Sequence, residues 1–249
     1  VVDSLDDDFS AFVFKIQANM NKAHRDRIAF MRIVSGRFDA DKEVYHVQGG
    51  KKLRLSRPQQ LMAAEREIIE EAYAGDIIGV FDPGIFSIGD TLCAPGKKFR
   101  FDPIPTFAPE HFKRVRSLDT MKRKQFLKGM EQIAQEGAIQ IFKTPYTGME
   151  EVIVGVVGTL QFDVLEYRLK NEYNVELYME GLPYEYLRWI ETDDGEPVKE
   201  EDLILGTDVK LVEDYKGNQL LLFGSQWAIG WTEERNKNLT FHEFGGTKF

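Results

Sequence analysis

Residues 27–34 read RIAFMRIV, a run of apolar and β-branched side chains that ends at Ser35-Gly36, and such a run predicts a β-strand. A strand of alternating character is expected before it, at residues 9–19. Shorter strand candidates follow it, separated by Gly and Pro, at residues 43–47, 52–55 and 76–81. Many short strands at close spacing with Gly and Pro between them indicate a small antiparallel β-barrel.

The second half of the chain changes to a helical period. Apolar side chains recur at helical spacing in residues 119–136, with Asp119 suited to the N-cap and Gly137 placed just past the end. A second amphipathic helix is expected between Gly158 and Asn174. Strands are expected at residues 113–116, 138–142, 152–157 and 175–179. This order is the β-α-β-β-α-β, or ferredoxin-like, plan.

The fold class expected is therefore mixed β and α+β, a small antiparallel β-barrel followed by a ferredoxin-like domain with a C-terminal extension. The extension, from Leu187, is expected to alternate short strands with acidic turns and to end in a helix at residues 226–236. Residues 94–109 form a proline-stiffened connection. We place the domain boundary there, with domains at residues 1–98 and 99–249.

Composition excludes several classes of protein. Hydrophobic residues make up 43% of the 249 and charged residues 29%, values typical of a globular protein with a core. No apolar stretch approaches the length of a membrane span, and the acidic start excludes a secretory signal peptide. The missing initiator Met indicates a fragment or a processed chain. The lone Cys93 suits a reducing cytosol, so we expect a cytoplasmic monomer with no membrane partner.

No motif for catalysis, metal binding or nucleotide binding is found. The four His are scattered without ligand spacing. Neither Gly-Lys pair, at 50–51 and 96–97, completes a P-loop, since the first Gly and the final Ser/Thr are missing. Paired acids at 70–71, 193–194 and 200–202 are interpreted as solvated faces. We therefore expect no catalytic residue, no metal and no cofactor in this chain.

Local basic patches point instead to a polyanionic partner. The net charge of −9 argues against nucleic acid, but residues 110–143 carry eight basic and four acidic side chains. Clustered Lys and Arg neutralise phosphates and gain affinity from the release of counterions. The alternative is a solvated charged surface. The candidate contacts are Lys22, His24, Arg25, Arg27, Lys51, Lys52, Arg114, Lys122, Arg123 and Lys124.

Several segments resemble domain II of the translational GTPases. These are residues 34–38 (VSGRF), 71–77 (EAYAGDI) and 88–92 (IGDTL). Two longer runs, 12–20 (FVFKIQANM) and 24–36 (HRDRIAFMRIVSG), are similar to those of one family among them, the bacterial class-II peptide-chain release factors. In the second half the same resemblance is carried by residues 107–110 (FAPE), 155–164 (GVVGTLQFDV) and 172–176 (EYNVE).

This resemblance implies a full protein that hydrolyses GTP with Mg²⁺ in a domain absent here and promotes dissociation of the codon-reading release factors. It implies that the present domains contact RNA and protein of the small ribosomal subunit. Three alternatives stay open: another translational GTPase such as elongation factor G, a general RNA-binding adaptor module, and a hydrolase with an unrecognised site. A hydrolase would require a pocket in which some of the paired acids converge.

Overall fold

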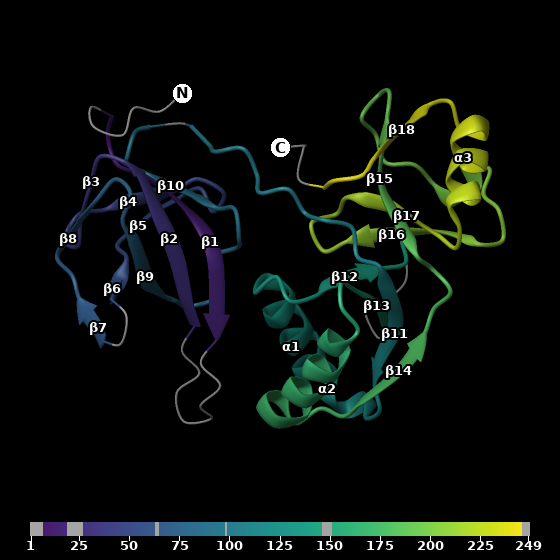
Figure 1. Cartoon of the computed structure of the whole chain (residues 1–249), viewed down its shortest axis with the longest axis horizontal. Coiled ribbons are helices and arrows are strands. Elements are labelled where there is room, and N and C mark those ends of the chain that lie inside the picture. The colour runs from purple at the N-terminus through teal and green to yellow at the C-terminus, as the bar shows by residue number, and fades with distance from the viewer. Residues whose placement is uncertain (1–6, 19–26, 63–64, 98, 146–150, 246–249) are drawn as a thin grey trace. The chain divides into compact units, whose positions relative to one another are not determined.

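The computed structural model describes residues 7–18, 27–62, 65–97, 99–145 and 151–245 (Figure 1). The chain divides into two compact units, residues 1–104 with 135–137 and residues 105–134 with 138–249. Among the helices of the described residues, none is long and apolar enough to cross a membrane.

The first unit is a curled antiparallel sheet that forms a half-barrel, in keeping with the small antiparallel β-barrel expected from the sequence. Its eight strands follow the order β5-β4-β10-β1-β2-β9-β6-β7. Their bounds are β1 (Ser10–Ala18), β2 (Arg27–Ser35), β4 (Val44–His46), β5 (Lys51–Leu53), β6 (Ser56–Met62), β7 (Glu65–Ile68), β9 (Ile77–Asp82) and β10 (Thr91–Cys93). A separate pair joins β3 (Arg37–Asp39) to β8 (Glu71–Tyr73). Alternate side chains of β1 and β2, including Val13, Met31 and Ile33, fill the core.

Strands β6 and β7 were not expected from the sequence. Pro58 lies inside β6, where its missing N–H indicated a break between strands. The register of β6 against β9 shifts between Ser56 and Gln59, on either side of this proline. A β-bulge of this kind lets a strand hold a proline without losing its partner.

The second unit begins with the ferredoxin-like plan expected from the sequence. Its elements are β11 (His111–Ser117), the 3₁₀ turn η1 (Thr120–Lys122), α1 (Arg123–Gln135), β12 (Gln140–Lys143), β13 (Glu151–Val156), α2 (Leu160–Tyr173) and β14 (Leu177–Gly181). The four strands follow the order β14-β11-β13-β12, and all are antiparallel. Helices α1 and α2 lie side by side on one face of this sheet (Figure 1). Phe126, Ile133, Phe162 and Leu165 bury the apolar stripes of the two helices against it.

The two helices end where the sequence places their signals, whereas Asp119 caps the 3₁₀ turn η1 and α1 begins only at Arg123. The Asp119 carboxylate accepts a hydrogen bond of 2.9 Å from the N–H of Met121 at the start of η1. Gly137 follows α1 with φ +80°. Asn174 closes α2 in the left-handed conformation, with φ 55°. Local capping residues therefore predicted these ends well.

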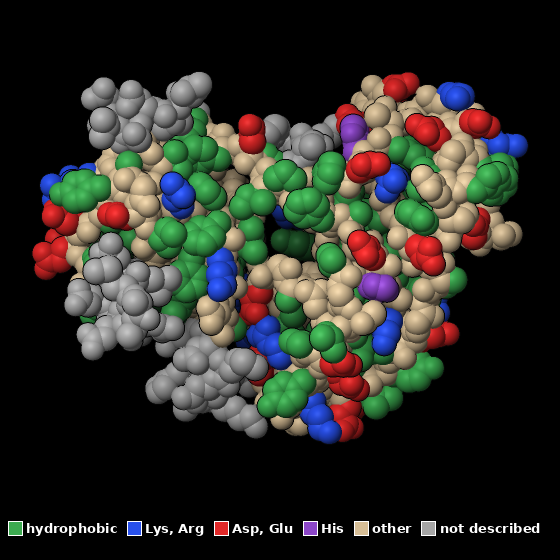
Figure 2. Space-filling model, in the orientation of Figure 1, with side chains coloured by type: hydrophobic (Ala, Val, Ile, Leu, Met, Phe, Trp, Pro, Cys, Tyr) green, Lys and Arg blue, Asp and Glu red, His purple; other side chains and the backbone are tan. Residues whose placement is uncertain are grey.

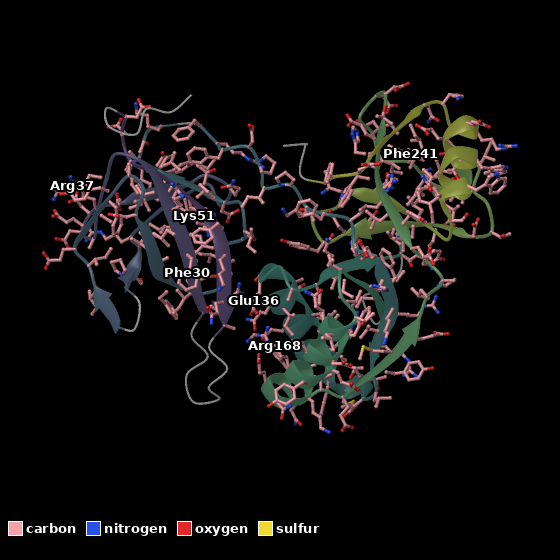
Figure 3. The ribbon with its side chains drawn as sticks, viewed as in Figure 1. Phe30, Arg37, Lys51, Glu136, Arg168 and Phe241 are labelled. Atoms are coloured by element: carbon pink, nitrogen blue, oxygen red, sulfur yellow. The ribbon has the colours of Figure 1, made fainter. Side chains whose placement is uncertain are left out.

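The C-terminal extension continues the same sheet. It contains β15 (Tyr186–Thr192), the 3₁₀ turn η2 (Glu200–Asp202), β16 (Val209–Asp214), β17 (Gln219–Phe223), α3 (Gln226–Arg235) and β18 (Leu239–His242). Strand β16 pairs with β12, so the ferredoxin-like sheet grows to eight strands. Helix α3 packs through Ala228 on β16 and β17, and Phe241, labelled in Figure 3, joins this cluster. The predicted helix at residues 226–236 is thus confirmed, but the extension does not end with it as expected, because β18 follows and pairs with β15.

Candidate nucleic-acid interface

The first predicted group of basic residues lies around the β1–β2 connection. Lys22, His24 and Arg25 are outside the described residues. Arg27 is the first residue of β2, and its side chain is only 7% exposed. Its Nη2 lies 3.5 Å from Oδ2 of the fully buried Asp82. Contrary to the expectation from the sequence, Arg27 does not present its guanidinium to solvent.

The second group lies on the edge of the half-barrel sheet. Lys51 and Lys52 begin β5, the outermost strand beside β4, and both side chains are exposed. Figure 3 labels Lys51 on this unit. Lys51 stands opposite His46 and Lys52 opposite Tyr45, so the two side chains leave opposite faces of the strand. A cationic edge of this kind also blocks pairing with a foreign strand.

Arg114 belongs to the outer face of the ferredoxin-like sheet, away from the helices. Its neighbour Lys113 lies 4.6 Å from the ring of Phe162 on α2, so alternation along β11 sends Arg114 and Arg116 to the other face. The Nη1 of Arg114 lies 3.2 Å from Oε2 of Glu180 on β14. The guanidinium of Arg116 lies 4.6 Å from the ring of Tyr178.

The remaining predicted residues lie at the start of α1. The ammonium of Lys122 donates a hydrogen bond of 2.7 Å to the carbonyl oxygen of Asn174 at the end of α2. This is where a helix dipole favours a cation, so Lys122 has a structural role. Arg123 and Lys124 are exposed, and Lys128 is exposed one turn beyond Lys124. The structure brings Arg123, Lys124 and Lys128 together on one helix, and we call these three the α1 cations.

The structure thus divides the basic stretch 110–143. Arg114 lies on the outer sheet face, whereas the α1 cations lie on the helical layer of the same domain. Figure 2 shows Lys and Arg interspersed with Asp and Glu over its visible face rather than in one continuous patch. Arg114 and the α1 cations were grouped because they are close in sequence, but they lie on opposite sides of the sheet. Lys128 follows Lys124 by four residues, and this helical spacing was the signal that joins them.

A groove of about 780 Å³ lies next to Arg114 in the second unit. Its walls are formed by residues 108–113, Thr159, Phe162 and residues 182–188. Burial raises the pKa of Tyr184 in this groove, although nearby Arg114 acts in the opposite direction. His111 and Lys113 provide cationic or hydrogen-bonding groups on one wall.

The paired acids do not gather in a pocket. Three cavities among the described residues have walls that include none of residues 70, 71, 193, 194 and 200–202. One of them is lined by Glu191 and Glu196, which lie on either side of the turn at residues 193–194. Among the described residues no group of three or more His, Cys, Asp or Glu side chains is arranged to hold a metal ion. None of the paired acids that a hydrolase would have to bring together lines any of these three cavities.

Two protein-family models match the chain. Residues 101–233 match the C-terminal domain of class II release factor RF3, and residues 8–95 match domain 2 of elongation factor G. The match to the first model covers more than half of the chain. The junction between the two matches lies within the proline-containing connection at residues 94–109.

Curated proteins of high similarity are named peptide chain release factor 3. The Symbiobacterium thermophilum protein is 55% identical over 241 residues, covering 97% of this chain and 45% of that protein. The Gloeobacter violaceus protein is 46% identical over 243 residues, covering 98% of this chain and 45% of that protein. The chain therefore spans slightly less than half the length of these relatives.

A solved structure shares the fold. A crystal structure of a Thermus thermophilus protein superimposes with a TM-score of 0.53 and 17% sequence identity. The match covers 84% of this chain and 31% of that one. At this identity the match supports the arrangement of strands and helices described above.

Proposed function

The chain belongs to the class II release factor family, and from this premise we propose that it is the ribosome-binding portion of a translation-termination GTPase. Its relatives of more than twice its length are named peptide chain release factor 3. The whole protein would use GTP with Mg²⁺ in a domain outside this chain. It would promote dissociation of the codon-reading release factors and act as a cytoplasmic monomer.

The α1 cations are the observation that carries ribosome binding. Arg123, Lys124 and Lys128 are exposed on a helix that Phe126 and Met130 anchor in the core. Phosphate contacts need cations that can reach outward from a rigid element without rearrangement of the backbone. We propose that this helix contacts RNA of the small subunit. Lys51 and Lys52 on the half-barrel edge would supply a second contact, and Arg114 a third.

A general RNA-binding module that stacks bases on its sheet is less well supported. The centre of the outer sheet face is covered by the protein's own extension. Ile153 of β13 and Phe142 of β12 are buried against Trp189 and Leu187 of β15. Bases stack on exposed aromatic side chains, so a covered sheet centre leaves no platform for them there.

Charge reversal on α1 tests the proposal. Arg123, Lys124 and Lys128 are changed together to Glu in the 249-residue chain, and binding to isolated small ribosomal subunits is measured over a range of salt concentrations. We expect weaker binding and a shallower dependence of log affinity on log salt, by about one for each lost phosphate contact. The fold should survive, since exposed substitutions usually change stability by within about 0.5 kcal/mol.

The matched control reverses three exposed lysines of the extension, Lys199, Lys216 and Lys237, to Glu. It produces the same change in net charge on another surface of the same unit. This control should bind more tightly than the α1 variant at every salt concentration. Equal loss in the two variants would mean that only the overall charge matters, and the proposed contact at α1 would then be rejected.

A further inference from the structure

Helix α3 carries an aromatic pair, the exposed Trp227 and the half-buried Trp231, that the proposed function does not use. Trp227 is 72% exposed, and Trp231 lies one turn later with its ring centroid 6.4 Å away. The third tryptophan, Trp189, is buried, at 7% exposure. Figure 1 shows α3 at the outer edge of the part of the second unit that the extension forms. An indole left this exposed is unusual, since tryptophan is highly buried on average and enriched at binding surfaces.

The helix that carries the pair is firmly held. Ser225 caps it, its hydroxyl accepting a hydrogen bond of 3.2 Å from the N–H of Ala228. Ala228 and Thr232 are buried on its inner side. Asn236 ties its end to the preceding loop through two bonds of 2.9 Å with the backbone of Ile204. The exposed indole of Trp227 and the half-buried indole of Trp231 are therefore carried on a firmly held helix, and we call them the Trp227–Trp231 stripe.

One indole of this stripe already contacts a cation within the protein. The guanidinium of Arg235 lies 4.0 Å from the ring of Trp231, a close cation–π contact. Gly230 lies between the two tryptophans in sequence, and a Cβ added there would meet nothing within 4 Å. The exposed indole of Trp227 is therefore accessible to a second cation from outside.

Charge around the helix selects the class of partner. Residues 185–245 contain fourteen Asp and Glu against six Lys and Arg, so they carry −8 of the chain's net −9. Glu233 and Glu234 are exposed on α3 itself. Exposed acids also occupy η2, which precedes the loop bound to Asn236. A surface of this sign repels nucleic acid phosphates and attracts a cationic polypeptide.

We infer that the Trp227–Trp231 stripe of α3 binds an Arg- or Lys-rich segment of a protein partner, with a cationic side chain lying over the indole of Trp227. The acids of α3 and η2 steer this segment to the helix, and the indole face gives the contact its geometry. Arg is the better fit, because its planar guanidinium stacks on an aromatic face. This inference does not depend on the α1 cations or on ribosome binding.

A peptide of alternating Arg and Gly residues is the probe, titrated calorimetrically into the full chain at low ionic strength. Trp227→Ala leaves the protein charge unchanged and should weaken binding about fivefold. Tyr167→Ala removes another exposed aromatic ring, on α2, and should bind as the unchanged protein does. Trp227→Phe keeps a smaller aromatic face, so its affinity for the peptide should lie between those of Trp227→Ala and the unchanged protein. It replaces Trp227→Ala in the test if Trp227→Ala melts at a lower temperature than the unchanged protein.

Three results would overturn the inference. If Trp227→Ala and Trp227→Phe both bind the peptide as tightly as the unchanged protein, the acids alone account for binding. If an oligouridine of matching length binds more tightly than the peptide and loses its affinity in Trp227→Ala, the stripe is a base-stacking surface. A peptide of alternating Glu and Gly should show no binding, and binding of that peptide would equally contradict the inference.

Discussion

Asp82 shows how one buried carboxylate organises a turn and a strand together. Its Oδ1 accepts hydrogen bonds from the N–H groups of Gly84, Ile85 and Phe86, at 2.8, 2.9 and 3.3 Å. Its Oδ2 faces the guanidinium of Arg27 on the neighbouring strand. From sequence, Arg27 was grouped with exposed cations, because nothing local reveals that β2 pairs with β9 at Asp82. Burial of an arginine is decided by its long-range partner.

We predict that Asp82→Ala destabilises the first unit by about 3 kcal/mol, since it leaves a buried cation without its carboxylate and three turn N–H groups without an acceptor. Asp76→Ala is the matched control, because that carboxylate accepts a bond from the exposed N–H of Tyr73. Asp76→Ala should lower the free energy of unfolding by about 1 kcal/mol or less. Urea unfolding measures both, and equal losses would contradict the assigned role of Asp82.

Cys93 provides a second test at the scale of one residue. The side chain is fully buried, and burial raises the pKa of its thiol above the ordinary value. A raised pKa means less thiolate at any given pH, so we expect alkylation by iodoacetamide at pH 8 to be much slower in the folded chain than in urea. Rates should rise only at more alkaline pH. Equal rates in the folded and unfolded chain would show that the thiol is accessible.

Helix ends are the elements that local sequence predicted best. Asn174 ends α2 in the left-handed conformation, and the N–H of Val175 reaches the carbonyl of Leu169 at 2.9 Å. Only Gly, Asn and Asp adopt this conformation readily, so a single residue type marks the end of the helix. Pro58 shows the opposite case, because a bulge set by the partner strand accommodates it inside β6.

The effect of a substitution at Asn174 on stability should depend on how readily the new residue adopts the left-handed backbone conformation. Asn174→Val is expected to destabilise the second unit by about 1–2 kcal/mol, because a β-branched side chain is strained at positive φ. Asn174→Gly should be neutral or slightly stabilising. Both variants keep the carbonyl that accepts the bond from Lys122. Thermal unfolding compares them, and similar melting temperatures for the two variants would contradict the prediction.

At the scale of the whole molecule, the division into two domains stays a prediction that fragments can test. Phe101 donates its N–H to the hydroxyl of Thr91 at 3.0 Å, and its ring lies 5.9 Å from that of Phe12. Residues just beyond the expected boundary at 98 therefore contact the half-barrel. A fragment of residues 1–104 should unfold cooperatively and melt at a higher temperature than one of residues 1–98. Equal melting temperatures would favour the boundary at 98.

The sequence by itself determined the type and order of most elements, because periodicity, capping residues and turn residues act over a few neighbours. The half-barrel, the ferredoxin-like plan and the identity of the candidate cations follow from such local signals. Only the tertiary structure decided which of these cations are exposed on a common surface. Arg27 is buried by its pairing with Asp82, and Arg114 is separated from the α1 cations by the sheet. The tertiary structure also pairs β16 with β12, so that the extension covers the centre of the outer face of the ferredoxin-like sheet. Exposure depends on contacts between residues far apart in the chain, and no local pattern of side chains records those contacts.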